Sequence, residues 1–222
     1  EKQGDETLPT GWNAAQREGF QVHSISLPDE NGKALSLSHA TENQWGWVRS
    51  QHLSHGRTGR ISVLVSMRVI SKKRAPRVRL SIEGESQGTE YYRFGSFSVD
   101  SQLPDSARLE EKWKVFAVHF NDVPSDLAKL RVGLDIHGQG EVQVDNVKVF
   151  DRWFDNQDRE ALTKIITTAA HNISAEEYLK AERLLESYWP RFLEEYVSFP
   201  ARDSISPSES DGETPQKKQP RN

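Results

Sequence analysis

The chain has no cysteine among its 222 residues. Disulfide bonds, thiolate metal sites and cysteine nucleophiles are therefore excluded. The absence does not identify a compartment, because a chain without cysteine is compatible with oxidising and with reducing surroundings.

Long apolar runs and an excess of basic residues are also missing. No run approaches the roughly 20 apolar residues that a membrane-spanning helix needs. The N-terminal sequence EKQGDETLPTG does not have the pattern of a signal peptide, so we expect a soluble segment cut from, or matured out of, a longer protein. The net charge is −4 and the isoelectric point is near 6.0, so we expect no nucleic acid partner and no membrane insertion.

The composition is polar for a folded protein, with 35% apolar and 28% charged residues. Part of this polarity comes from residues 200–222, which contain no aromatic side chain. Such a segment cannot bury enough apolar surface to offset its ordering entropy, so we predict a disordered tail. At the other end, residues 1–11 are predicted to be a lead-in to the first folded region.

Between residues 12 and 150 the apolar residues recur with a period of two. The segments RISVLVSMRVI, RVRLSIEG, KVFAVHF and KLRVGLDIHG each alternate between apolar and polar residues. Turn sequences such as DENGK, SHGRTG, NDVPSD and HGQG separate them. Short alternating strands at this spacing, with no long helix between them, predict an antiparallel β-sandwich and argue against a parallel α/β fold.

Between residues 151 and 199 the period changes to that of a helix. One face of the first helix is predicted to carry Leu162, Ile165, Ile166, Ala169 and Ile173. A second helix is predicted to begin with a capping box from Ser174 to Glu177, and Pro190 is expected to end or kink it. This region is therefore predicted to be an α-helical hairpin packed on the sandwich.

Several motifs resemble the jelly-roll carbohydrate-binding modules that accompany secreted glycoside hydrolases. They are LPTGW at 8–12, NGKALSLS at 31–38, EKWKVFAVHF at 111–120 and LRVGLDIHGQGEVQVDNVKVF at 130–150. The resemblance covers about residues 8–150 and implies a mainly β, jelly-roll fold. It also implies a non-catalytic glycan-binding or cell-surface accessory module of an extracellular or cell-envelope protein, next to another domain of the same chain. In such modules the residue equivalent to Asp145 helps to hold calcium, but the usual first-strand glutamate is missing here, so we expect no metal.

Ten side chains are candidates for a ligand platform on the outer face of the sandwich. Trp45, Trp47, Arg49 and Gln51 share one side of an extended QWGWVRSQ segment, because alternate side chains point the same way. Sugars present apolar ring faces to indoles and hydroxyl groups to carboxylates, amides and guanidinium groups. The full set is Trp45, Trp47, Arg49, Gln51, Arg68, Arg79, Glu83, Arg131, Asp135 and His137.

Two alternatives to a platform remain open at the sequence level. The same residues could be a solvated face, with the indoles folded over an edge of the sandwich. The aromatic segment EYYRFGSF at 90–97 could be a glycan-gripping loop or a strand with one aromatic residue turned inward. In the alternative function, the helical hairpin docks a protein partner or an adjacent domain, and Tyr188, Trp189, Phe192 and Tyr196 then form an exposed apolar patch.

Catalysis and cofactor binding have little support in the sequence. Glu83 and Asp135 could share a sheet face as the two carboxylates of a glycosidase, but such pairs arise by chance on any polar sheet. His52 and His55 lie close together without a third ligand at metal-site spacing. Phosphate-binding loops, nucleophile elbows and dinucleotide fingerprints are absent, so we predict a non-enzyme without cofactors.

Overall fold

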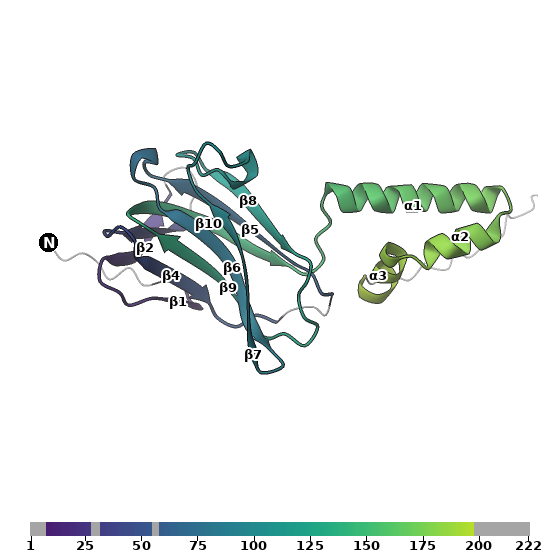
Figure 1. The fold of residues 1–222 in the computed structure, drawn as a ribbon, viewed down its shortest axis with the longest axis horizontal. Coiled ribbons are helices and arrows are strands. Elements are labelled where there is room, and N and C mark those ends of the chain that lie inside the picture. Colours follow the sequence, from purple (N-terminus) through teal and green to yellow (C-terminus); the bar gives the residue numbers. More distant parts are fainter. Residues whose placement is uncertain (1–7, 28–31, 55–57, 198–222) are drawn as a thin grey trace, which may run out of the picture. The chain divides into compact units, whose positions relative to one another are not determined.

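The computed structural model describes residues 8–27, 32–54 and 58–197. The predicted tail at 200–222 and most of the predicted lead-in lie outside these residues. The chain forms two compact units that divide between Ala161 and Leu162. The first contains all the strands, and the second contains most of the helical region (Figure 1).

The first unit is a sandwich of two antiparallel five-stranded sheets (Figure 1). Sheet A has the strand order β1-β4-β9-β6-β7, and sheet B has the order β2-β3-β10-β5-β8. The strands of sheet A are β1 (Trp12–Ala14), β4 (Trp45–Ser50), β9 (Ala128–His137), β6 (Arg77–Ser86) and β7 (Thr89–Phe97). Those of sheet B are β2 (Phe20–Ser26), β3 (Lys33–His39), β10 (Gly140–Phe150), β5 (Ile61–Val69) and β8 (Lys114–Phe120).

The predicted mainly β, jelly-roll sandwich is confirmed. Several successive strands, from β4 to β6 and from β8 to β10, alternate between the two sheets, which places strands that are distant in sequence side by side. The inward face of each predicted strand fills the space between the sheets, as the alternation requires. Fully buried side chains include Val63, Met67, Leu80, Ile82, Phe116, Leu134 and Ile136.

Glycine residues allow the two sheets to approach closely near their edges. A Cβ atom at Gly46 of β4 would overlap the ring of Phe20 on β2. A Cβ atom at Gly95 of β7 would lie 2.7 Å from Cγ2 of Val118 on β8. In both cases a side chain of sheet B occupies the space that a side chain of sheet A would need.

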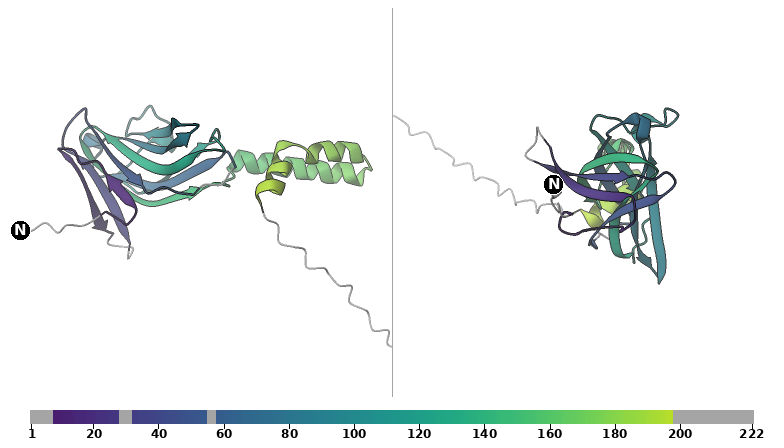
Figure 2. Two further views of the ribbon diagram at one scale, coloured as in Figure 1. Left: turned by 90° about the horizontal axis from the view of Figure 1, so that it is seen from below. Right: turned by 90° about the vertical axis from the view of Figure 1, so that its left-hand side faces the viewer.

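The helical region contains three helices: α1 (Asn156–Ser174), α2 (Tyr178–Leu185) and α3 (Tyr188–Tyr196). After α1 the chain turns back, as a hairpin requires (Figures 1 and 2). The predicted capping box is wrong. Ser174 is still part of α1, and its hydroxyl donates to the carbonyl oxygen of Ala170, while Glu177 caps α2 without a side-chain hydrogen bond.

The second predicted helix is divided before Pro190, which lies in the first turn of α3. A proline has no N–H to donate to the carbonyl four residues earlier, at Glu186, and its ring clashes there. The helix accordingly ends at Leu185 and a new one begins at Tyr188. The predicted apolar face of α1 is wrong in part, since Ala169 and Asn172 are buried whereas Ile166 and Ile173 are exposed.

Candidate functional site

The outer face of sheet A collects eight of the ten predicted side chains. In the register of the sheet, Trp45 faces His137, Trp47 faces Asp135, and Arg49 faces Gly133. On the other side of β9, Arg79 faces Asp135 and Glu83 faces Arg131. The alternation of β4, β9 and β6 therefore places these residues on one surface, opposite the core-facing side chains of the same strands.

Arg49 connects the acidic residues at the centre of this face. Its Nε atom is 2.5 Å from Oε1 of Glu83, and its Nη2 atom is 2.7 Å from Oδ1 of Asp135. The other oxygen of Glu83 pairs with Nε of Arg131 at 2.8 Å. The side chains of Arg49, Glu83 and Asp135 are each less than 15% exposed. Removing one partner would leave a largely buried charge uncompensated, which is energetically costly. The network therefore keeps these three side chains paired.

Small residues make room for this network. A Cβ atom at Gly133 would lie 2.7 Å from Nη1 of Arg49 and 2.5 Å from Oγ of Ser81. The arginine side chain therefore crosses β9 over Gly133 to reach the carboxylates on both sides. A larger residue at this position would displace the guanidinium group.

Aromatic rings surround the second arginine of the face, Arg79. Its Cζ atom lies 4.3 Å from the ring centroid of Trp45 and 4.4 Å from that of Phe94. The Trp45 ring also contacts His137, with the centroids 4.4 Å apart. Trp45 and Trp47 are half-buried, and Trp47 also packs against the buried core cluster.

The most exposed aromatic rings of the face come from β7. Phe94 is 44% exposed and Tyr92 is 37% exposed, and their ring centroids are 5.6 Å apart. The Tyr92 hydroxyl donates to Oδ2 of Asp135 at 2.9 Å. Burial raises the pKa of Tyr92, and the neighbouring charge of Asp135 raises it further. The hydroxyl therefore remains protonated and continues to donate this bond at neutral pH.

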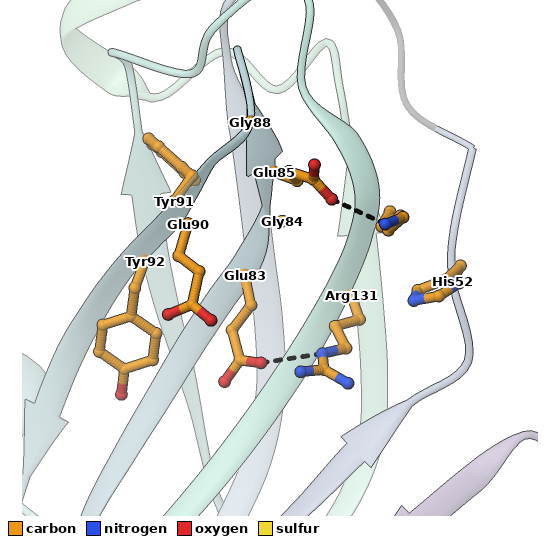
Figure 3. Close-up of a pocket in the computed structure, with 10 residues that line it drawn as sticks. His52, Glu83, Gly84, Glu85, Gly88, Glu90, Tyr91, Tyr92 and Arg131 are labelled. Carbon is orange, nitrogen blue, oxygen red and sulfur yellow. Dashed lines mark hydrogen bonds and ion pairs between the residues drawn. The ribbon is translucent and has the colours of Figure 1, made fainter.

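A shallow pocket of about 430 Å³ lies at one end of the same face (Figure 3). Its charged lining includes Glu83, which pairs with Arg131, and Glu85, which pairs with Lys129 at 2.7 Å. Lys129 has a positive φ of 54° at an irregularity in the pairing of β9 with β6. Such bulges turn side chains in new directions, and here Lys129 reaches Glu85 on the outer face.

Two predicted residues lie apart from the other eight. Arg68 is on β5 of sheet B, where its guanidinium group lies over Trp113 and donates to Gln143. Strand alternation predicts which residues share a face, but it does not say to which sheet a strand belongs, and this is why Arg68 was grouped with the others. Gln51 follows the end of β4, and its side chain lies against Gly11 at the edge of the sheet.

Sequence reasoning missed several members of the face. Tyr92 and Phe94 are outward because EYYRFGSF is a strand with Tyr91 turned inward. Their place beside β6 depends on the β6–β7 hairpin, whose Gln87-Gly88 turn has positive φ at both residues. That short glycine turn between two alternating segments was the available signal. His52, Glu85, Glu90 and Lys129 carried no comparable signal in the sequence.

No metal site emerges within the part of the chain that the structure describes. No group of three or more histidine or acidic residues there could hold a metal ion. Asp145, the candidate calcium ligand of the resemblance, instead accepts hydrogen bonds from the backbone and side-chain nitrogens of Asn146. Across residues 8–27, 32–54 and 58–197, no helix is long and apolar enough to cross a membrane.

Comparisons with known proteins connect this chain only to solved structures. No family model matches it, and no curated protein matches it. A family 11 carbohydrate-binding module from Clostridium thermocellum, in complex with a β-1,3-1,4-mixed-linked tetrasaccharide, is 12% identical with a TM-score of 0.47. The match covers 68% of this chain and 95% of that one.

Two solved structures that contain family 22 modules are also similar to the chain at low sequence identity. The xylan-binding domain of Xyn10C from Paenibacillus barcinonensis is 13% identical with a TM-score of 0.43, over 65% of this chain and 88% of that one. The xylanase 10B fragment of Clostridium thermocellum, complexed with xylohexaose, is 10% identical with a TM-score of 0.47. That match covers 64% of this chain and only 26% of the longer fragment.

Proposed function

We propose that this protein is a non-catalytic glycan-binding module and that the outer face of sheet A is its binding surface. The observation that carries the proposal is the combination of exposed aromatic rings and fixed charged groups on one open sheet face. Aromatic rings offer apolar surface to the faces of sugar rings, and carboxylates and guanidinium groups hydrogen-bond to their hydroxyl groups. The neighbouring solved structures with bound oligosaccharides are consistent with this proposal.

The geometry of the two candidate catalytic carboxylates favours binding over hydrolysis. A glycosidase needs two carboxyl groups on opposite sides of the bond that it cleaves. Here Arg49 bridges Glu83 and Asp135, and its guanidinium group fills the space between them. Asp135 also accepts from Tyr92, and Glu83 also pairs with Arg131, so both carboxylates are engaged in holding the face together.

A glycan array with the full chain tests the proposal directly, using alanine variants of three aromatic residues. We expect binding to at least one polysaccharide, and we expect Trp45→Ala and Phe94→Ala to weaken it by about tenfold, since aromatic contacts contribute about 1 kcal/mol or more. Trp113→Ala is the matched control, because Trp113 also lies against an arginine but contacts it on sheet B. Equal binding by the wild type and the three variants would show that the outer face of sheet A is not the binding surface.

Thermal unfolding of the same variants separates binding from folding. Trp45 is half-buried on the outer face, so we expect Trp45→Ala to lower the unfolding free energy only slightly. A loss of about 3–5 kcal/mol would instead identify Trp45 as part of the core. Trp47→Ala should be costlier than Trp45→Ala, because Trp47 packs against the core cluster.

We propose further that the module belongs to an extracellular or cell-envelope protein and is attached to an adjacent domain. A glycan ligand of the polymeric kind is found outside cells or in their envelopes, where such a module would keep its parent protein near the substrate.

The helical unit supports a second candidate function, a protein-interaction surface. Its large apolar side chains include several that are at least half exposed: Ile166, Tyr178, Leu179, Leu185 and Tyr188. Exposed apolar residues of this kind form an interaction surface where they lie together in one patch. The four aromatic residues of α3 pack on one another, with Phe192 buried at 4% exposure and Tyr188 exposed at 58%.

A further inference from the structure

Arg79 differs from Arg49 and Arg131 on the face of sheet A because no carboxylate pairs with it. Arg49 and Arg131 each pair with an acidic side chain. Within the described residues, no hydrogen bond or ion pair reaches the side chain of Arg79, although the residue lies directly opposite Asp135 in the register. The two oxygens of Asp135 are already engaged, one by Arg49 and one by Tyr92.

Two aromatic rings lie next to the guanidinium group of Arg79. The ring centroids of Trp45 and Phe94 lie 4.3 and 4.4 Å from Cζ, and the Nε atom is buried without a partner among the described residues. The two Nη atoms also have no partner there, but they are not among the buried unpaired atoms, so they reach solvent. An arginine that lies between aromatic rings and has its outer nitrogens free can bind a carboxylate through two hydrogen bonds.

The charges along the face are distributed unevenly. Near Arg79, the outward residues on the neighbouring positions are Asp135, whose charge is paired with Arg49, and the exposed Arg77, which has no ion pair within the part of the chain that the structure describes. At the opposite end, the pocket carries three acidic residues, Glu83, Glu85 and Glu90 (Figure 3). Glu83 and Glu85 are paired there with Arg131 and Lys129. Among the described residues, the charges without an ion pair are therefore Arg77 and Arg79 at one end of the face and Glu90 at the other.

We propose that this face binds an acidic glycan, with the carboxylate of a uronic acid residue at the exposed edge of Arg79. The inference rests on the proposed glycan-binding function and adds the chemical class of the ligand. The uronate carboxylate receives two hydrogen bonds from the Nη atoms, with Arg77 as a second cation nearby. Neutral hydroxyl groups of the following sugars extend toward the acidic end, where Glu85 and Glu90 act as acceptors.

The test compares matched pairs of polymers, each pair having the same backbone with and without its charge. The full chain is titrated calorimetrically with polygalacturonate and with glucuronan, and with the carboxyl-reduced form of each. We expect at least one acidic polymer to bind about tenfold more tightly than its reduced form, because a charge-assisted hydrogen bond is stronger than one between neutral groups. Added salt should reduce this difference, since the carboxylate is bound near the surface.

Variants of two arginines identify the group responsible. Arg79→Gln should remove the preference for the acidic polymer, and Arg79→Lys should restore only part of it, because lysine keeps the charge but not the paired donors. Arg68→Gln is the matched control: Arg68 also lies over a tryptophan, but on sheet B, and its replacement should leave the preference unchanged. Melting temperatures of all variants show whether a loss of preference reflects unfolding.

The outcomes separate this inference from the proposed function. Equal affinity for charged and reduced polymers, or a preference that survives Arg79→Gln, would overturn the inference and leave a neutral glycan-binding module. If no polymer of either kind binds, and the glycan array is also negative, both the inference and the proposed function are rejected.

Discussion

Arg49 is the residue on which the charges of the sheet face converge. It is one of four polar residues in the QWGWVRSQ segment, and alternation alone assigns it to the side of Trp45 and Trp47. Its partners Glu83 and Asp135 come from two other strands, 34 and more residues later in the sequence. A single side chain therefore connects three strands, which explains why the face is rigid enough to present a defined surface.

Tyr92 provides a prediction at the residue scale through its raised pKa. A tyrosine whose pKa is higher in the folded than in the unfolded state stabilises the fold fully below the unfolded value, about 10. This stabilisation is lost as the pH rises through the folded pKa. Tyr92→Phe should cost about 1 kcal/mol at neutral pH, from the lost bond to Asp135, and should make stability fall less steeply above about pH 10.

Urea unfolding of the wild type and of Tyr92→Phe, at neutral and at alkaline pH, measures both effects. Tyr91, whose pKa is also raised by burial, is present in both proteins, so it does not contribute to the difference between them. Parallel pH profiles for the two proteins would show that the Tyr92 hydroxyl has no special role in the face.

At the scale of elements, the sandwich depends on positions where a strand of sheet A lacks a side chain. Gly46 lies between Trp45 and Trp47, so this part of the strand presents two large indoles outward and no side chain inward. Phe20 of sheet B, which is 8% exposed, fills the inward space. The WGW sequence thus combines an outward aromatic pair with a close approach of the two sheets.

Gly46→Ala is therefore expected to destabilise the sandwich strongly. The added methyl group would overlap the Phe20 ring, and overpacking of this kind costs about 1–3 kcal/mol or more. The double variant Gly46→Ala with Phe20→Leu should recover part of the loss, because the two sites are in contact and their effects are not additive. Chemical unfolding of the wild type, of Gly46→Ala and of the double variant measures the three free energies of unfolding.

Val115→Ala serves as the control for this prediction. Val115 is 63% exposed on β8, and its truncation should change stability by no more than about 0.5 kcal/mol. A Gly46→Ala protein as stable as the Val115→Ala control would mean that Phe20 can move aside at no cost.

At the scale of the whole molecule, the face and most of the helical region belong to different compact units. All eight residues of the face lie in the unit that ends at Ala161. That unit also contains the ion pair between Arg60 and Asp158 and the hydrogen bond from Thr58 to the carbonyl oxygen of Asp151. These contacts attach the chain after β10 to the residues just before β5.

A chain that ends after Ala161 should therefore keep both the fold and the glycan binding. It retains every strand and the contacts at Asp151 and Asp158, so we expect a strand-rich circular dichroism spectrum and an affinity within about twofold of that of the full chain. A shorter chain ending at Phe150 should be less stable, because it loses both contacts. Loss of glycan binding on removal of the helices would favour a role for the helical unit in ligand recognition.

The sequence alone determined the strands, their inward faces and most of the outward candidates. Alternation is a local property, so a residue such as Asp135 is assigned to a face by its neighbours within the same strand. The switch from a period of two to one of 3.6 likewise located the helical region. The exact starts and ends of its helices could not be predicted as well. The Ser174 hydroxyl donates to a backbone carbonyl within α1 and does not cap α2, and the helix before Pro190 ends at Leu185, about one turn earlier.

Only the tertiary structure decided which strands are neighbours. The assignment of a strand to a sheet and its pairing there depend on long-range packing, which has no signal in the local sequence. This pairing separated Arg68 from Arg79, although both are arginines on alternating strands of similar composition. It also brought Phe94 of β7 and Trp45 of β4 to Arg79, although the strands β9 and β6 lie between β4 and β7 in the sheet. The unpaired guanidinium edge that results is a property of the assembled sheet, since its three residues lie on three strands that only folding brings together.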